Sequence, residues 1–230
     1  INNIDRDFSY ITDILLRKNL DYDILGEEEF LKAQMKNAYM AIGDAEYKLL
    51  IIPPCITISK ETATRIRDFV NCGGKVLFLS RPPQKDIDEN SLEYINELFL
   101  GLGDLNTAYD TYDNNHRVCA KKQELSENVV YLNGGVLKDN EPTELLVDVI
   151  ESLIQRDVKI RFNGERNGNV YYNHHIKNGS DIYFIHNSDE EEQYDIDATF
   201  RCVKKNAYLF DPESGEICLV NPIIEDKKST

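Results

Sequence analysis

Two apolar runs flank one amphipathic segment in residues 48–79, which read KLLIIPPCITISKETATRIRDFVNCGGKVLFL. The first run ends at Pro53-Pro54 and is typical of a strand buried on both faces. Ser59 is a good N-cap for a helix that Gly73-Gly74 would end. The apolar run at 76–79 predicts a second strand. Strand, helix and strand in this order form a βαβ unit, which implies a parallel sheet with a right-handed crossover.

Upstream of this unit, an N-terminal helix with Asn19 as its stop is predicted by apolar residues at helical spacing: Ile4, Phe8, Ile11 and Leu15. Residues 22–25 and 38–42 predict two short strands, and residues 27–32 predict one helical turn. Helices and strands therefore alternate from the start of the chain.

Downstream of the unit, residues 91–99 predict a helix that ends at Gly101 and Gly103. Residues 104–128 are polar and irregular and give no assignment. Residues 129–132 predict a strand. A further helix, which Thr143 is expected to cap, is predicted by a dense set of apolar residues: Leu145, Leu146, Val149, Ile150, Leu153 and Ile154.

The apolar pattern changes from a period of 3.6 to a period of 2 after about residue 157. Short alternating segments follow one another up to Val220, separated by turn signals such as Asn178-Gly179. This spacing is typical of an antiparallel sandwich. We therefore expect an α/β domain over residues 1–157, packed against an antiparallel β-sandwich portion over residues 158–230.

Composition excludes several classes of function. The chain has 230 residues, 41% of them hydrophobic, with 13 Tyr and 9 Phe, which is enough apolar material for a core. Its formal net charge of −15 repels phosphate backbones, so we expect no nucleic acid partner. No apolar stretch is long enough to predict a membrane span. Five cysteines without a CxxC pair indicate no disulfide framework, and the compartment stays open.

Two blocks of the sequence resemble known proteins. The first extends from Tyr47 through Leu50–Pro54, Ser59 and Gly73–Val76. It resembles the amidotransferase-like α/β domain that follows the catalytic barrel in β-galactosidases and α-L-rhamnosidases. In β-galactosidases this is called a trimerisation domain.

The second block comprises Asp181–Asn187, Thr199–Arg201 and Leu209–Glu216. It is similar to late β-sandwich strands of α-L-rhamnosidase-like glycosidases, in which the last motif usually reads W-D-P-x-T-G. Phe210 replaces the Trp of that motif here, and Ser214 replaces the Thr. Together the two blocks touch most of residues 36–220.

The resemblance implies a flavodoxin or class I amidotransferase-like parallel sheet with flanking helices, followed by the β-sandwich portion. It also implies that a catalytic (β/α)₈ barrel lies upstream in the parent chain and is a partner of this segment. Such a barrel needs about 250 residues, so this chain does not contain one. A homo-oligomer is a further partnership that the resemblance suggests.

No catalytic, metal or cofactor site is predicted from the residues. The acidic pairs Asp21/Asp23, Glu27–Glu29 and Asp189–Glu192 lie in turns or polar ends, as solvated surface charge does. His174 and His175 are neighbours on a strand and would point to opposite faces, which disfavours a shared metal ion. His116 and His186 have no nearby ligand pattern.

A nucleophilic cysteine is also disfavoured. The strand at 76–79 is followed by Ser80-Arg81-Pro82-Pro83. This segment has no cysteine to act as the nucleophile, and its prolines lack the backbone N–H groups that would form an oxyanion hole. Cys72 instead lies at a predicted helix end before that strand.

Tyr171 and Tyr172 are the candidate substrate-binding residues, since aromatic side chains in a sheet can stack on a sugar ring. The alternative is that one of them is core and the other surface, and the absence of Trp weakens the sugar-binding interpretation. Three hypotheses follow. The chain is a non-catalytic accessory segment of a larger glycoside hydrolase, a carbohydrate-binding module acting through the sandwich, or a free-standing Cys hydrolase using Cys72.

Overall fold

The structure is a computed structural model that describes residues 2–79, 83, 85–87, 121–133, 141–164, 168–202 and 206–220. Several sequence-based predictions fall outside these ranges: the helix over 91–99 with its terminal glycines, residues 104–120 with His116, and Ser80–Pro82. None of the helices in the described ranges is long and apolar enough to cross a membrane.

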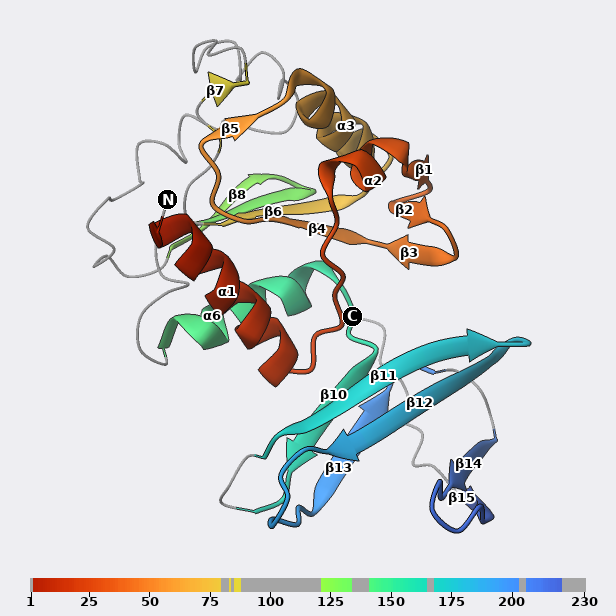
Figure 1. Cartoon of the computed structure of the whole chain (residues 1–230). Coiled ribbons are helices and arrows are strands. Elements are labelled where there is room, and N and C mark those ends of the chain that lie inside the picture. The colour runs from red at the N-terminus through yellow and green to blue at the C-terminus, as the bar shows by residue number, and fades with distance from the viewer. Residues whose placement is uncertain are drawn as a thin grey trace.

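A four-stranded sheet with the order β4-β6-β9-β8 forms the centre of the N-terminal part (Figure 1). Strands β4 (Leu49–Ile52), β6 (Lys75–Leu79) and β9 (Val129–Asn133) run parallel, with Leu50 opposite Val76 and Leu77 opposite Val130. The predicted βαβ unit and its parallel pairing are therefore confirmed. Strand β8 (Lys121–Ser126) lies antiparallel on one edge, within the stretch that the sequence left unassigned.

The sheet is covered on both faces because successive side chains of a strand point in opposite directions. Val76, Phe78, Val129 and Tyr131 pack into one apolar cluster, with Ala63, Ile66, Phe69 and Val70 of α3 (Lys60–Asn71). Leu77, Leu79, Val130 and Leu132 pack into a second cluster, with residues of α1 (Asn2–Arg17) and α6 (Glu141–Leu153). Figure 1 shows α3 and α1 with α6 on opposite sides of the sheet. The result is a three-layered α/β arrangement.

Helix α3 begins and ends as its sequence predicts. Ser59 is the N-cap, and its Oγ accepts a hydrogen bond of 3.1 Å from the backbone N–H of Thr62. At the other end Gly73 takes a φ of 95°, and the N–H of Gly74 donates to the carbonyl of Phe69 at 2.9 Å. Helix α6 differs from expectation: it begins at Glu141, so Thr143 lies inside its first turn and is not its cap.

A small meander precedes the parallel sheet. Helix α2 (Glu27–Lys32) is followed by β1 (Gln34–Lys36), β2 (Tyr39–Ile42) and β3 (Ala45–Tyr47), which pair in that order. Two predictions are corrected here. Ala38, with a φ of 71°, lies in the hairpin turn before β2. Residues 22–25 form no strand, because they pair with no other strand in the part of the chain that the structure describes.

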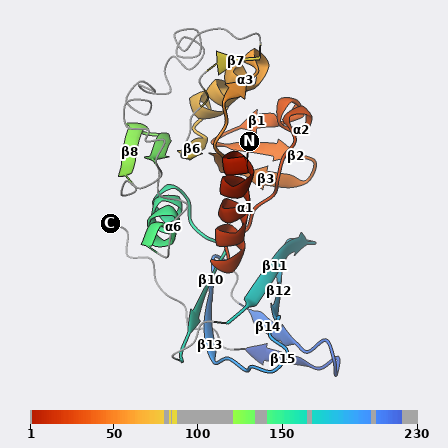
Figure 2. The same cartoon turned by 60° about the vertical axis from the view of Figure 1, so that its left-hand side comes forward.

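The C-terminal part consists of antiparallel two-stranded ladders. Strand β10 (Val158–Phe162) pairs with β13 (Ile196–Phe200), β11 (Val170–Lys177) with β12 (Ser180–Asn187), and β14 (Ala207–Phe210) with β15 (Ile217–Val220). Outside this part, in the N-terminal half of the chain, strand β5 (Thr57–Ile58) pairs in parallel with β7 (Lys85–Asp86). Figures 1 and 2 both show β10–β15 beyond the C-terminal end of α1, away from the parallel sheet. The predicted antiparallel strands are present.

Gly74→Ala tests the packing of α3 on the sheet. An added Cβ would lie 2.3 Å from the ring of Phe69, which is fully buried. Overpacking of this kind costs about 1–3 kcal/mol. We expect a loss of that size in the free energy of unfolding, measured by urea denaturation. Gly164→Ala is the matched control, because its Cβ would meet no atom within 4 Å and no change is expected.

Candidate functional site

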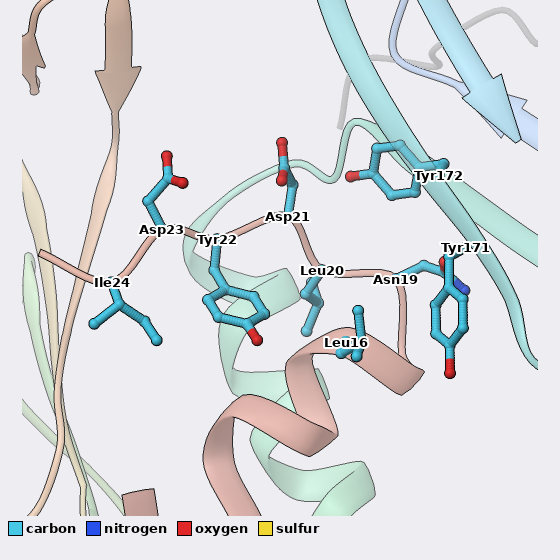
Figure 3. A pocket seen from close by; sticks show the side chains of 9 residues that line it. All are labelled: Leu16, Asn19, Leu20, Asp21, Tyr22, Asp23, Ile24, Tyr171 and Tyr172. Carbon is cyan, nitrogen blue, oxygen red and sulfur yellow. The ribbon is translucent and has the colours of Figure 1, made fainter. Parts of the chain in front are cut away.

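A hollow of about 330 Å³ lies where the C-terminal end of α1 and the segment 19–24 approach β11 (Figure 3). Its walls are formed by Leu16, Asn19, Leu20, Asp21, Tyr22, Asp23, Ile24, Tyr171 and Tyr172. Both predicted substrate-binding residues therefore line the same hollow, and both are half-buried. The wall opposite them comes from residues 19–24.

Asn19 makes the turn that shapes this wall. Its φ of 53° ends α1, and the N–H of Leu20 donates to the carbonyl of Leu15 at 2.9 Å. Leu20 is buried in the second apolar cluster and holds the following residues in place. The side-chain Oδ1 of Asn19 is buried without a hydrogen-bond partner. A buried acceptor in this state is uncommon and favours a donor from outside the chain.

Asp21 and Asp23 project from the same side of the extended segment, and Tyr22 projects from the other (Figure 3). Asp23 is engaged: the hydroxyl of Tyr47 on β3 donates to its Oδ2 at 2.5 Å. Burial of Tyr47 raises the pKa of its hydroxyl to about 12, and this hydrogen bond adds to the effect. Asp23 therefore ties the segment to the meander.

Asp21 lies beside Tyr172, whose hydroxyl points toward it in Figure 3. Loss of hydration raises the pKa of Asp21, and the negative charges of Asp157 and Asp23 raise it further, while His174 acts in the opposite direction. Burial likewise raises the pKa of Tyr172, followed by the charges of Asp21 and Asp157. Tyr172 thus forms the polar contact between β11 and the segment after α1.

Tyr171 projects away from Tyr172, as neighbouring residues of a strand do (Figure 3). Its hydroxyl lies 3.4 Å from Oδ1 of Asn169, and its ring centroid lies 5.8 Å from that of His186. The two tyrosine rings therefore do not form one flat platform. Each instead contributes to a different wall.

Behind the hollow, charged side chains join the ladders β10/β13 and β11/β12. We call Asp157, His174, Asp181 and Arg201 the His174 cluster. Nδ1 of His174 lies 3.1 Å from Oδ2 of Asp157, and Nε2 lies 3.1 Å from Oδ1 of Asp181. Arg201 forms an ion pair with the other oxygen of Asp157. Each ring nitrogen of His174 therefore faces a carboxylate oxygen, to which it donates where it carries a proton.

The ring of His174 is also stacked on Tyr183, with a centroid distance of 4.2 Å and an interplanar angle of 11°. Burial raises the pKa of Tyr183 to about 12, and the charges of Asp157 and Asp181 contribute. Since both nitrogens of His174 face carboxylates, neither is directed at a metal. Among the residues that the structure describes, no group of three or more His, Cys, Asp or Glu side chains is arranged to hold a metal ion.

A second hollow, of about 340 Å³, lies at the carboxyl end of β4 and contains a thiol that the sequence did not single out. It is lined by Cys55, which is half-buried, and by Glu27, Ser59 and Thr62. The carboxylate of Glu27 accepts hydrogen bonds from both hydroxyls, at 2.5 Å from Ser59, and these bonds lower the pKa of Glu27. Glu27 therefore occupies the N-terminus of α3, where an anion would otherwise bind.

Cys72, the thiol considered from the sequence, lies elsewhere. It caps the C-terminus of α3, and its Sγ donates to the carbonyl of Phe69 at 3.1 Å. Cys55 had a signal in the sequence, because it directly follows the prolines that end a buried strand, the edge at which open α/β sheets bind ligands.

A comparison with protein families identifies one match over most of the chain. The family is described as alpha-L-rhamnosidase, and it matches residues 16–222. These residues include both walls of the hollow and the whole His174 cluster. No curated protein matches the chain.

His174→Ala is expected to destabilise the protein. The substitution leaves the carboxylates of Asp157 and Asp181, both largely buried, with a single cation near them. Removing one partner of a fully buried ion pair lowers the free energy of unfolding by about 3–5 kcal/mol. We expect a loss of about 2–3 kcal/mol here, because some solvent reaches the two acids. Urea denaturation measures the loss. His175→Ala is the control, since His175 is exposed and a change below about 0.5 kcal/mol is expected. Equal effects of the two substitutions would contradict this account of the cluster.

Asp21→Asn is expected to make the protein slightly more stable at neutral pH. Because the pKa of Asp21 is raised above its usual 3.8, its ionisation is harder in the folded than in the unfolded chain. The folded state therefore loses stability as the pH rises through this range, and the substitution removes that loss. Asp21 keeps considerable solvent access, so we expect a gain below about 1 kcal/mol. Unfolding curves of both proteins at pH 7 and pH 3 test this, because the difference should vanish at the lower pH.

Proposed function

Because this chain belongs to the α-L-rhamnosidase family of glycoside hydrolases, we propose that it is a non-catalytic, structural segment of such an enzyme. Glycoside hydrolysis needs two carboxyl groups, roughly 5–10 Å apart, that face one glycosidic bond. Of the four acids around the first hollow, three are held by side chains of the protein. Asp157 and Asp181 contact His174, and Asp23 accepts from Tyr47. That the protein's own side chains hold three of these four carboxylates is the observation that carries the proposal.

The finer architecture belongs to the same proposal. We propose that the α/β part, residues 1–157, is amidotransferase-like and that residues 158–230 form a β-sandwich portion. The three-layered arrangement of the parallel sheet supports the first assignment. At the boundary, Arg156 donates from Nη1 to the carbonyl of Lys18 at 2.8 Å and forms an ion pair of 2.7 Å with Glu151. Both contacts lie within residues 1–157, whereas α1 contacts β11 of the second part, and that contact supports two parts that are packed together.

We further propose that the segment packs on a catalytic barrel of the parent enzyme. The hairpin β14/β15 supports a partner surface, because its large apolar side chains are exposed: Tyr208, Leu209, Phe210, Ile217 and Leu219. A second copy of the chain is the alternative partner. Sedimentation velocity at increasing concentration separates the two, since only self-association would depend on the concentration of this chain alone.

Carbohydrate binding is the second candidate function. The observation that favours it is the hollow shared by Tyr171 and Tyr172. The third candidate, a Cys hydrolase, is less supported, because Cys72 lies at the C-terminal end of α3. Selective labelling of Cys72 by a thiol reagent at neutral pH would favour this third candidate.

We expect the purified chain to show no hydrolysis of aryl α-L-rhamnosides or aryl β-galactosides above the rate without protein. Release of the aryl alcohol, followed by absorbance, measures this. Turnover that Asp21→Asn or Asp23→Asn abolishes would overturn the accessory role, because it would assign the chemistry to the acids of the hollow. Turnover unaffected by both substitutions would point to a contaminating enzyme or to another site, which repurification would distinguish.

A further inference from the structure

We propose that the hollow between α1 and β11 is a glycan-binding site that takes an uncharged sugar residue and rejects acidic sugars. This inference rests on the second candidate function, carbohydrate binding, and adds the class of ligand. It does not depend on the chain being catalytic. The hollow has a volume at the lower end of the range of about 300–1,000 Å³ found for ligand sites, which suits one or two sugar residues.

Beside the amide NH2 of Asn19 and the tyrosine hydroxyls, the hollow has two acceptors, Oδ1 of Asn19 and the Asp21 carboxylate, to which a ligand could donate. Oδ1 of Asn19 is buried and has no partner. Asp21 presents a carboxylate whose pKa is raised by loss of hydration. An ionised carboxylate accepts hydrogen bonds and donates none. A ligand rich in hydroxyl groups would satisfy both residues, and its hydroxyls would replace the water that Asp21 has lost.

The charges around the hollow select against anions. Asp21 and Asp23 line it, and Asp157 is close enough to raise the pKa of Asp21. The chain as a whole carries a formal net charge of −15. A uronate or a phosphate would add a like charge next to these groups, and like charges at such short range repel strongly where water is partly excluded.

The apolar groups of the hollow favour a sugar ring over a small cation. Leu16 and Ile24 are exposed on its walls, at 47% and 65% of their surface, beside the rings of Tyr22 and Tyr171. The C–H face of a pyranose packs on such surfaces, whereas a bare amine leaves them in water. The combination of acceptors with apolar and aromatic walls is the pattern expected of a neutral sugar site.

The two walls come from different parts of the protein. Asn19 and Asp21 follow α1, whereas Tyr171 and Tyr172 lie on β11. A sugar in the hollow would contact both parts, and because it would bind only the folded chain, it would stabilise that chain increasingly as its concentration rises above the Kd. Binding is therefore expected to raise the melting temperature of the chain.

The test is a titration of the chain with L-rhamnose, D-galacturonate and spermidine, followed by NMR chemical shifts and by melting temperature. We expect saturable binding of rhamnose and at least tenfold weaker binding of galacturonate at neutral pH. Tyr171→Ala and Asp21→Ala should each weaken rhamnose binding about tenfold, which corresponds to one charge-assisted hydrogen bond or one aromatic contact. Tyr10→Ala is the matched control, because this tyrosine of α1 is exposed and does not line the hollow.

Asp21→Asn separates charge from folding, because this variant is expected to be at least as stable as the parent chain. It should reduce the preference for rhamnose over galacturonate. Galacturonate binding as tightly as rhamnose, binding of spermidine alone, an unchanged affinity in Tyr171→Ala, or no binding of any of the three would each overturn the proposal. None of these outcomes bears on the accessory role, which the hydrolysis assay tests independently.

Discussion

Strand β6 is buried on both of its faces, and this is the constraint on which the rest of the structure depends. Val76 and Phe78 point to one face and Leu77 and Leu79 to the other, and all four side chains are fully buried. Both faces must then be covered, by α3 on one side and by α1 with α6 on the other. Because Leu20 is buried in the same cluster as α1, the segment that lines the first hollow is held at the edge of this core.

The C-terminal part is held together by a different kind of interaction. In the His174 cluster, Asp157 directly precedes β10 and Arg201 directly follows β13, whereas His174 and Asp181 lie on β11 and β12, so the cluster connects the two ladders. A charged interior stabilises less than an apolar one of equal volume, but its geometry is far more restrictive. In this protein the fixed partners of His174 determine the relation of one ladder to the other.

The sequence predicted those helices and strands that are determined by residues close to one another in the chain. The βαβ unit follows from two apolar runs and one amphipathic helix, and Ser59 caps that helix as its side chain suggests. Residues 22–25 looked like a strand but form no ladder: Tyr22 packs against the second apolar cluster, and Asp23 accepts from Tyr47 of β3. The His174 cluster had no local signal, since Asp157 and Arg201 lie far apart in sequence and meet only through the pairing of β10 with β13. Strand β8 was missed because an edge strand can be polar.

The position of Glu27 has a consequence for how this α/β scaffold has been adapted. Open parallel sheets usually receive phosphorylated ligands where a helix begins beside the carboxyl ends of the strands. Here that position holds the protein's own carboxylate, fixed by Ser59 and Thr62. The scaffold thus carries an internal counter-ion, and a nucleotide or sugar phosphate would have to displace it before it could dock. The glycan site that we propose between α1 and β11 has a different lining and does not use this edge of the sheet.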